Sequence, residues 1–201
     1  IMADTKGDEL MALAAEKGIL RARDLDAHDI PREYLRRLTK RGDLVRLGRG
    51  LYQRADHDVT AQHSLAEAAK RVPKGVLCLL SALRVHDPTT QNPFDVWMAI
   101  GHKDRKPTVD HLSLRVVRMS GAARTEGIEK REIEGVSVPV YGPAKTVADC
   151  FKFRTTVGTD VAIEALRDFH RKRAGTMDQL WHYADICRVR TVIKPYMEAI
   201  V

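Results

Sequence analysis

The chain has 201 residues, 44% of them hydrophobic, which is enough for one large core or two small ones and too little for three domains. Its 34 lysine and arginine residues against 27 aspartate and glutamate residues give a formal net charge of +7, which favours polyanionic partners. No apolar run reaches the roughly 20 residues of a membrane span and no signal peptide is recognisable, so we expect a cytoplasmic protein without membrane contact. Cys78, Cys150 and Cys187 lie far apart in apolar segments and are expected to be reduced core residues.

Residues 1–58 are predicted to form a winged helix-turn-helix domain. Helical spacing covers Asp8 to Lys17, Gly18 supplies a left-handed stop, and a brief second helix is expected from Arg21 to His28. A third helix is expected from Pro31 to Arg41, because the fixed φ of a proline suits a first helical position. Two β-rich segments around a Gly-rich turn then predict a hairpin, the wing, over Leu44 to Arg54.

Positive charge is concentrated in the third helix and the wing. Residues 30–54 contain eight basic side chains and two acidic ones, a net +6, whereas residues 1–29 contain four basic and seven acidic ones. A local excess of this kind suits a phosphate-facing surface, with a merely solvated basic face as the alternative. On the helical wheel Pro31, Tyr34, Leu35 and Leu38 share the side predicted to pack. The predicted DNA-binding residues are Arg32, Arg36, Arg37, Lys40, Arg41, Arg46, Arg49 and Arg54.

Each part of this surface has an expected role on DNA. The third helix of such a domain enters the major groove, where residues near its N-terminus reach base edges and later ones reach phosphates. Arg32 and Arg36 are therefore the predicted base readers, because arginine donates two parallel hydrogen bonds to guanine, worth about 1–3 kcal/mol of discrimination. Arg49 lies between two glycines at the wing turn and is predicted to reach a minor groove.

Residues 59–201 are predicted to form a larger domain of mixed α and β structure, so the whole chain is of the mixed α/β (α+β) class. The apolar segment from Val76 to His86 is interpreted as a buried helix. The other predicted elements are a helix over Ala61–Arg71, β-strands over Phe94–Ile100, Leu112–Met119 and Val136–Tyr141, and helices over Pro143–Phe153, Thr159–Arg173 and Met177–Arg188, with a last piece ending at Val201.

Three segments carry a family resemblance. The stretch ALAAEKGILRARDLDAHDIPREYLRRLTKRGDLVRLGRGLY, residues 12–52, resembles the N-terminal domain of the AbiEi family of bacterial antitoxins. The segments LSALRVH (Leu80 to His86) and VPVYGPAKTVADCFKFRTTVG (Val138 to Gly158) are similar to parts of the C-terminal domain of the same family. The second of these carries more weight than the winged helix, because winged helices occur in many families.

The resemblance implies a DNA-binding autorepressor and antitoxin of a type IV toxin-antitoxin, or abortive-infection, system. It implies binding to double-stranded DNA at promoter repeats, and neutralisation of a nucleotidyltransferase-like toxin without a stable complex. We expect no enzymatic activity and no cofactor; a stand-alone regulator without a toxin is the alternative. Polar residues in the matched C-terminal segments are candidates for antitoxin function, with a purely structural role as the other interpretation: Ser81, His86, Lys145, Thr146 and Asp149.

A metal-dependent nuclease and a zinc site are less well supported by the sequence than a DNA-binding regulator. Asp95 followed by Asp104, Arg105 and Lys106 superficially resembles a nuclease carboxylate set, but the latter residues lie in a polar turn rather than at converging strand ends. The histidines lack a recurrent zinc-ligand spacing, and no phosphate-binding glycine loop is present. The histidines that prompted the zinc question are His57, His63, His102 and His111.

Overall fold

A computed structural model of the chain describes residues 5–58, 60–86, 95–109 and 112–200. It divides the chain into two compact units, and each is described here by itself. Unit 1 contains residues 1–70 and 132–137, and unit 2 contains residues 71–131 and 138–201. Both contain helices and a β-sheet, so the predicted mixed α/β class is confirmed. Phe94, His111 and Val201, which the sequence analysis names, lie outside the described residues.

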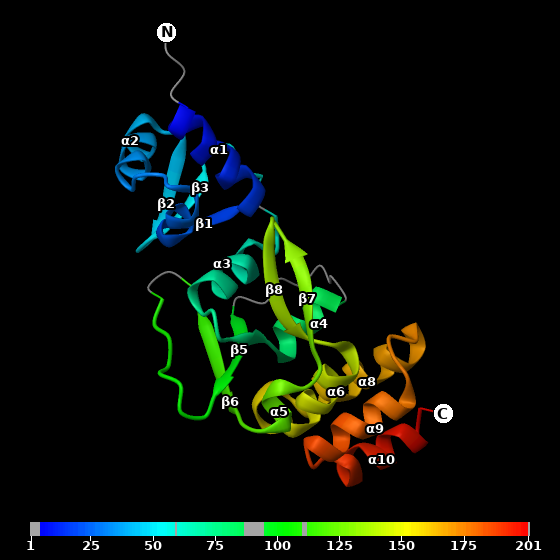
Figure 1. The fold of residues 1–201 in the computed structure, drawn as a ribbon. Coiled ribbons are helices and arrows are strands. Elements are labelled where there is room, and N and C mark those ends of the chain that lie inside the picture. Colours follow the sequence, from blue (N-terminus) through cyan, green and yellow to red (C-terminus); the bar gives the residue numbers. More distant parts are fainter. Residues whose placement is uncertain (1–4, 59, 87–94, 110–111, 201) are drawn as a thin grey trace. The chain divides into compact units, whose positions relative to one another are not determined.

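Unit 1 has the element order of a winged helix-turn-helix, shown in blue and cyan in Figure 1. Three helical segments come first in the fold, the middle one a 3₁₀-helix, and a hairpin follows them. Strand order is β1-β3-β2, with β3 antiparallel to both neighbours and Leu20 opposite Tyr52. The elements are α1 (Thr5–Lys17), β1 (Ile19–Arg21), η1 (Ala22–His28), α2 (Glu33–Arg41), β2 (Leu44–Gly48), β3 (Leu51–Arg54) and α3 (His63–Arg71).

The core of unit 1 confirms the predicted helical faces. Leu10 and Leu13 of α1, and Leu35 and Leu38 of α2, are buried in one cluster, with Tyr34 packed against it. Leucines lie on one face of α2 and charged residues on the other, and this decides which face packs. Burial of apolar surface stabilises the fold by about 25 cal/mol per Å². The opposite face of α2 stays in solvent.

Helix α2 begins two residues later than predicted. Pro31 is exposed and precedes the helix, and Arg32 is its N-cap residue. Bonds from Tyr34 N to Pro31 O and from Leu35 N to Arg32 O form a tighter turn that leads into the helix. The 100° spacing does not hold in that turn, so Pro31 does not join the packed face.

The boundary of unit 1 depends on Glu134, which lies in the turn between β7 (Ile128–Ile133) and β8 (Val136–Tyr141). Its carboxylate accepts hydrogen bonds from Thr60 N (2.6 Å), His63 Nδ1 (2.6 Å) and His57 Nε2 (3.3 Å). Burial alone would raise the pKa of Glu134, but the bonds from His63 and Thr60 outweigh it and lower the pKa. These contacts extend the compact unit to Lys70, past the division after residue 58 that the sequence suggests.

Gly18 is a position where we expect alanine to be poorly tolerated. Its φ is +61°, and an added Cβ would overlap the carbonyl oxygen of Glu134. Gly42 also has a positive φ, +91°, but an added Cβ would meet nothing within 4 Å. Gly42→Ala should therefore cost only backbone strain, about 1 kcal/mol, and Gly18→Ala about 2–4 kcal/mol. Hydrogen exchange of the Leu10 and Leu38 amides measures the loss of stability in each variant. Equal losses of protection in Gly18→Ala and Gly42→Ala would contradict the predicted difference.

Unit 2 is built on a five-stranded sheet in the order β6-β5-β4-β8-β7. β4 pairs antiparallel with β5 and parallel with β8, and β5 pairs parallel with β6. Its further strands are β4 (Val76–Leu77), β5 (Val96–Gly101) and β6 (Leu114–Met119). Its helices are α4 (Leu79–His86), α5 (Ala122–Thr125), α6 (Pro143–Lys152), α7 (Arg154–Val157), α8 (Thr159–Lys172), α9 (Met177–Ile186) and α10 (Arg190–Glu198).

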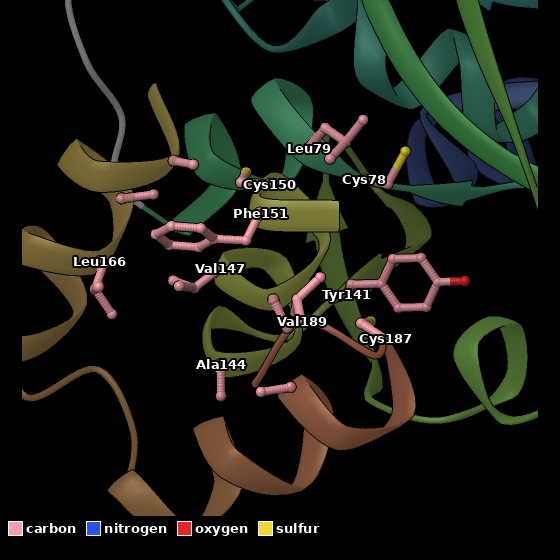
Figure 2. Close-up of a cluster of buried hydrophobic side chains, with 14 of the residues drawn as sticks. Cys78, Leu79, Tyr141, Ala144, Val147, Cys150, Phe151, Leu166, Cys187 and Val189 are labelled. Carbon is pink, nitrogen blue, oxygen red and sulfur yellow. The ribbon is translucent and has the colours of Figure 1, made fainter. Parts of the chain in front are cut away.

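Helix α6 is the centre of unit 2. It packs against α4, α8, α9 and α10, and each residue from Ala144 to Phe151 is buried. Val147 and Phe151 of α6 and Leu166 of α8 form part of the apolar core drawn in Figure 2. A helix buried on every side needs its polar side chains to find partners inside the protein.

The structure corrects several predictions for the second half of the chain. The apolar segment from Val76 to His86 is not one helix, because its first two residues form β4 and α4 begins at Leu79. A short apolar run has the same appearance in a buried strand and in a buried helix, and periodicity does not separate them. The strand β7 and the short elements β1, α5 and α7 were not predicted from the sequence.

The three cysteines lie where the sequence predicts them, in the apolar core. Cys78, Cys150 and Cys187 are free thiols and buried, as predicted, and burial raises the pKa of each, to about 12 for Cys187. Thiols with raised pKa values are weak nucleophiles, which agrees with a packing role. Across the described residues, no helix combines the length and apolar character needed to cross a membrane.

Candidate nucleic-acid interface

The candidate interface is the solvent-facing side of α2 together with the β2–β3 hairpin. Helix α2 exposes its basic residues because its leucines turn toward the core. The hairpin places Arg49 at its turn, where Gly50 has a positive φ of 69° and allows the tight reversal. Seven of the eight predicted DNA-binding residues are exposed, and Arg54 is half-buried.

Arg32, Arg41 and Arg54 each have a carboxylate partner within unit 1. Arg32 pairs with Asp26 at 2.9 Å, Arg54 pairs with Asp56 at 2.5 Å, and Arg41 pairs with Asp43. Exposed ion pairs of this kind contribute about 0–1 kcal/mol, so DNA phosphates are able to compete for these arginines. The pairs nevertheless reduce the positive field that a phosphate meets at these positions.

Two further arginines have contacts of other kinds. The guanidinium of Arg37 lies 4.1 Å from the centroid of the Tyr34 ring, a cation–π contact. The Nε of Arg46 donates to the carbonyl oxygen of Gly48, 3.2 Å away, which orients the side chain along the wing. Both guanidinium groups still carry N–H donors that phosphate oxygens accept well.

The remaining three predicted residues, Arg36, Lys40 and Arg49, are here called the open cations. No other described residue forms an ion pair or hydrogen bond with their side chains. Arg36 and Lys40 are four residues apart on the exposed face of α2 and therefore point the same way. Arg49 is at the tip of the wing. The open cations bring positive charge from two elements to solvent without a competing carboxylate.

The polar residues predicted for the second domain have a different setting, inside unit 2. The carbonyl oxygen of Tyr141 accepts hydrogen bonds from His86 Nε2 (2.6 Å) and Thr146 Oγ1 (3.0 Å). Ser81 lies apart from them, and its Oγ accepts from Trp97 N at 2.8 Å. These contacts join α4, α6 and the ends of β5 and β8, so each of the three residues has a structural task.

Lys145 and Asp149 form a fully buried ion pair one turn apart on α6. Lys145 Nζ lies 2.6 Å from both carboxylate oxygens of Asp149 and 4.2 Å from the centroid of the Tyr141 ring. Cys187 Sγ donates to the same carboxylate at 3.3 Å. Burial raises the pKa of Asp149, and the Lys145 ammonium opposes that effect. The pair is closed off from solvent, and a role of these residues in antitoxin activity stays a prediction.

The geometry does not bring together the nuclease residues weighed in the sequence. Asp95 precedes β5 and Asp104 follows it, so the six residues of that strand separate them by roughly 20 Å. Asp95 is hydrogen-bonded to Ser113 and Arg115, and Asp104 Oδ2 accepts from Gly101 N. Within the ranges that the structure describes, no group of three or more acidic, histidine or cysteine side chains is arranged to hold a metal ion.

Comparison with known proteins places the N-terminal segment. Residues 8–55 match the family described as "Transcriptional regulator, AbiEi antitoxin". The resemblance to the AbiEi family is confirmed there. The matched segment includes α2, the wing and all three open cations. A comparison with curated proteins finds no match.

A solved structure is similar in fold to this chain over more than the matched segment 8–55. The crystal structure of the RV2827C protein from Mycobacterium tuberculosis has a TM-score of 0.59 and 15% sequence identity to this chain. The similarity covers 90% of this chain and 71% of that chain, so it extends through most of unit 2. At this identity the likeness shows a shared fold.

Several partners of the candidate site residues could not be identified from the sequence as it was read. The carboxylate partners Asp26 and Asp56 lie just outside residues 30–54, for which the net +6 was counted, so the surface is less positive than that count suggests. The spacing of Arg54 and Asp56 across two residues is a signal that was available. Nothing local in the sequence indicates that Tyr141 and Cys187 surround the Lys145–Asp149 pair.

Proposed function

We propose that the protein is a DNA-binding transcriptional regulator that represses its own operon through α2 and the wing. One observation carries the proposal: the open cations lie on the exposed face of a winged helix-turn-helix whose segment matches a family of transcriptional regulators. An unpaired cation gives up no ion pair when it binds a DNA phosphate, whereas a paired cation must first exchange its carboxylate partner.

The roles of the open cations follow from their chemistry and position. Arg36 lies in the first half of α2, where residues of a recognition helix reach base edges, and its planar fork suits guanine. Lys40 lies one turn later, and its compact charge suits a phosphate. Arg49 at the wing tip suits a narrow minor groove, where negative potential is strongest.

We also propose that the chain acts as the antitoxin of a type IV system, with unit 2 as the part that counteracts a nucleotidyltransferase-like toxin without a stable complex. The support is the antitoxin in the description of the matched family and the earlier resemblance of Leu80 to His86 and Val138 to Gly158. The proposal assigns no catalytic step and no cofactor to this chain. Regulation without a toxin partner is the alternative outcome.

Two assays test the two halves separately. A reporter placed behind the chain's own upstream DNA should fall in expression when the full chain is supplied, and an unchanged reporter would contradict autorepression. Co-expression with the neighbouring gene product should restore growth if that product is toxic and this chain is its antitoxin. Repression without growth rescue would leave a regulator and overturn the antitoxin half.

A further inference from the structure

The turn between β7 and β8 has a residue that its backbone does not favour. Two residues, Glu134 and Gly135, separate the strands. Their φ angles are 50° and 73°. Two positive φ values are typical of the type I′ turn, which prefers Asn-Gly, Asp-Gly or Gly-Gly. A glutamate with positive φ is strained, and such strain persists where the surroundings require that side chain. Glu134 is thus better explained by its carboxylate than by the turn.

The carboxylate of Glu134 is bound to one segment of unit 1. Its side chain is 3% exposed. One oxygen accepts a hydrogen bond from Thr60 N (2.6 Å), and the other accepts from His63 Nδ1 (2.6 Å) and His57 Nε2 (3.3 Å). All three donors belong to the stretch that follows β3 and leads into α3. The carboxylate therefore holds the chain where it leaves the central strand of the three-stranded sheet.

The backbone of the same turn packs against the chain where it enters that sheet. Gly18 directly precedes β1, and an added Cβ on it would overlap the carbonyl oxygen of Glu134. An added Cβ on Gly135 would come within 2.8 Å of the carbonyl oxygen of Glu16. The turn is thus in close contact with the residue before β1 and bonded to the residues after β3.

These contacts lie at the end of the sheet opposite the wing tip. Near the turn, Ile19 of β1 is paired with Gln53 of β3. At the other end, Ala22 N donates to the carbonyl oxygen of Gly50, 3.0 Å away, beside Arg49. Because β3 pairs with both other strands, its direction sets where Arg49 lies. A wing that is fixed before binding also loses less conformational entropy on DNA.

We infer that Glu134 is a positioning residue for DNA binding, which fixes the base of the three-stranded sheet and so holds the wing where Arg49 reaches DNA. The inference rests on the proposed function and adds a part to it. The DNA-binding unit is discontinuous in sequence, because residues 132–137 complete it. The family segment, residues 8–55, ends before that turn. Glu134 acts through the wing and not by a contact of its own with DNA.

The test replaces Glu134 by asparagine in the full chain and measures the affinity for its upstream DNA. Glu134→Asn creates the Asn-Gly pair that a type I′ turn prefers, so the turn itself should keep or gain stability. The side chain is one carbon shorter and loses its bonds to Thr60 and His63. We expect the affinity to fall about tenfold, as for the loss of one charge-assisted contact.

Asp29→Asn is the matched control. Asp29 is an exposed residue of unit 1 and also has a φ of 50°. Its replacement removes the same charge from the same kind of backbone position, so any electrostatic gain on DNA is common to both variants. Asp29→Asn should not lower the affinity.

A comparison of backgrounds separates positioning from a loss of fold. Once Arg49→Ala has removed the wing contact, Glu134→Asn should lower the affinity by less than about twofold, whereas in Arg36→Ala it should still cost about tenfold. His63→Ala should lower the affinity as well, and His63→Ala/Glu134→Asn no further than the larger single loss. A loss of stability alone would lower the affinity equally in every background.

The possible results separate this inference from the proposed function. Unchanged affinity in Glu134→Asn overturns the positioning role and leaves the proposed function intact. Equal losses in the wild-type, Arg36→Ala and Arg49→Ala backgrounds, or an equal loss in Asp29→Asn, do the same. Absence of DNA binding by the wild type overturns both.

Discussion

Lys145→Ala should destabilise unit 2 by about 3–5 kcal/mol, the largest effect on stability that we expect from one polar substitution in this chain. The substitution leaves Asp149 buried without its cation, and among the described residues Cys187 is the remaining side-chain hydrogen-bond donor to its carboxylate. Burial already raises the pKa of Asp149, and without Lys145 only the smaller effects of the Cys187 hydrogen bond and the Lys152 charge oppose it. The carboxyl group must then either take up a proton or remain as an unpaired buried charge.

The double variant Lys145→Met/Asp149→Leu is the matched control. It removes both charges and keeps apolar volume in the centre of α6, so we expect its stability to lie within about 1 kcal/mol of the wild type or above it. Trp97 and Trp181 both contribute to the core of unit 2, and their fluorescence during urea unfolding reports on this unit. A loss below about 1 kcal/mol in Lys145→Ala would contradict the ion-pair interpretation.

Replacing the open cations together, as Arg36→Ala/Lys40→Ala/Arg49→Ala, should lower the affinity for the upstream DNA by at least about a hundredfold. The variant loses the predicted base contact of Arg36, worth about 1–3 kcal/mol, the predicted phosphate contact of Lys40 and the predicted minor-groove contact of Arg49. All three side chains are exposed and have no partner among the described residues, so the fold of unit 1 should be preserved. Circular dichroism checks the fold, and fluorescence anisotropy measures the affinity.

Removal of whole ion pairs provides the comparison. Asp26→Ala/Arg32→Ala and Arg54→Ala/Asp56→Ala leave the net charge unchanged, and because these arginines are already paired, each should change the affinity by less than about threefold. A larger loss in Asp26→Ala/Arg32→Ala would assign Arg32 the base contact that the sequence predicts. Among the single variants, Arg36→Ala should relax base preference and Lys40→Ala should weaken all duplexes alike. If the ion-pair variants lose as much affinity as the open-cation variant, the distinction between open and paired cations is wrong.

The sequence predicted the parts of unit 1 that local periodicity determines. The leucines of α1 and α2 and the Gly-rich turn around Arg49 are local signals, and the structure places all of them as expected. It did not predict β1, because a strand of three residues exists only through its pairing with β3, more than 30 residues later. The start of α2 shifted by two residues for the local reason that a 3₁₀-type turn follows Pro31.

The candidate sites were harder to predict, because their properties depend on partners distant in the sequence. The spacing of Lys145 and Asp149 is common on exposed helix faces, and only the packing of α4, α8, α9 and α10 around α6 buries the pair. In the same way, the sequence shows Asp104 only as an acidic residue in a polar turn, whereas in the structure its carboxylate lies near Arg124 and its carbonyl oxygen accepts from Arg118. Local charge counts identify a basic surface, but not which of its charges are already compensated.

The most direct test of the central claim compares the affinity of the wild-type chain for its own upstream DNA with that for a shuffled duplex of equal length and composition. At physiological salt we predict a preference of about a thousandfold or more, together with a steep fall of log affinity against log salt. Equal and weak affinity for the two duplexes would contradict the claim that α2 and the wing read DNA.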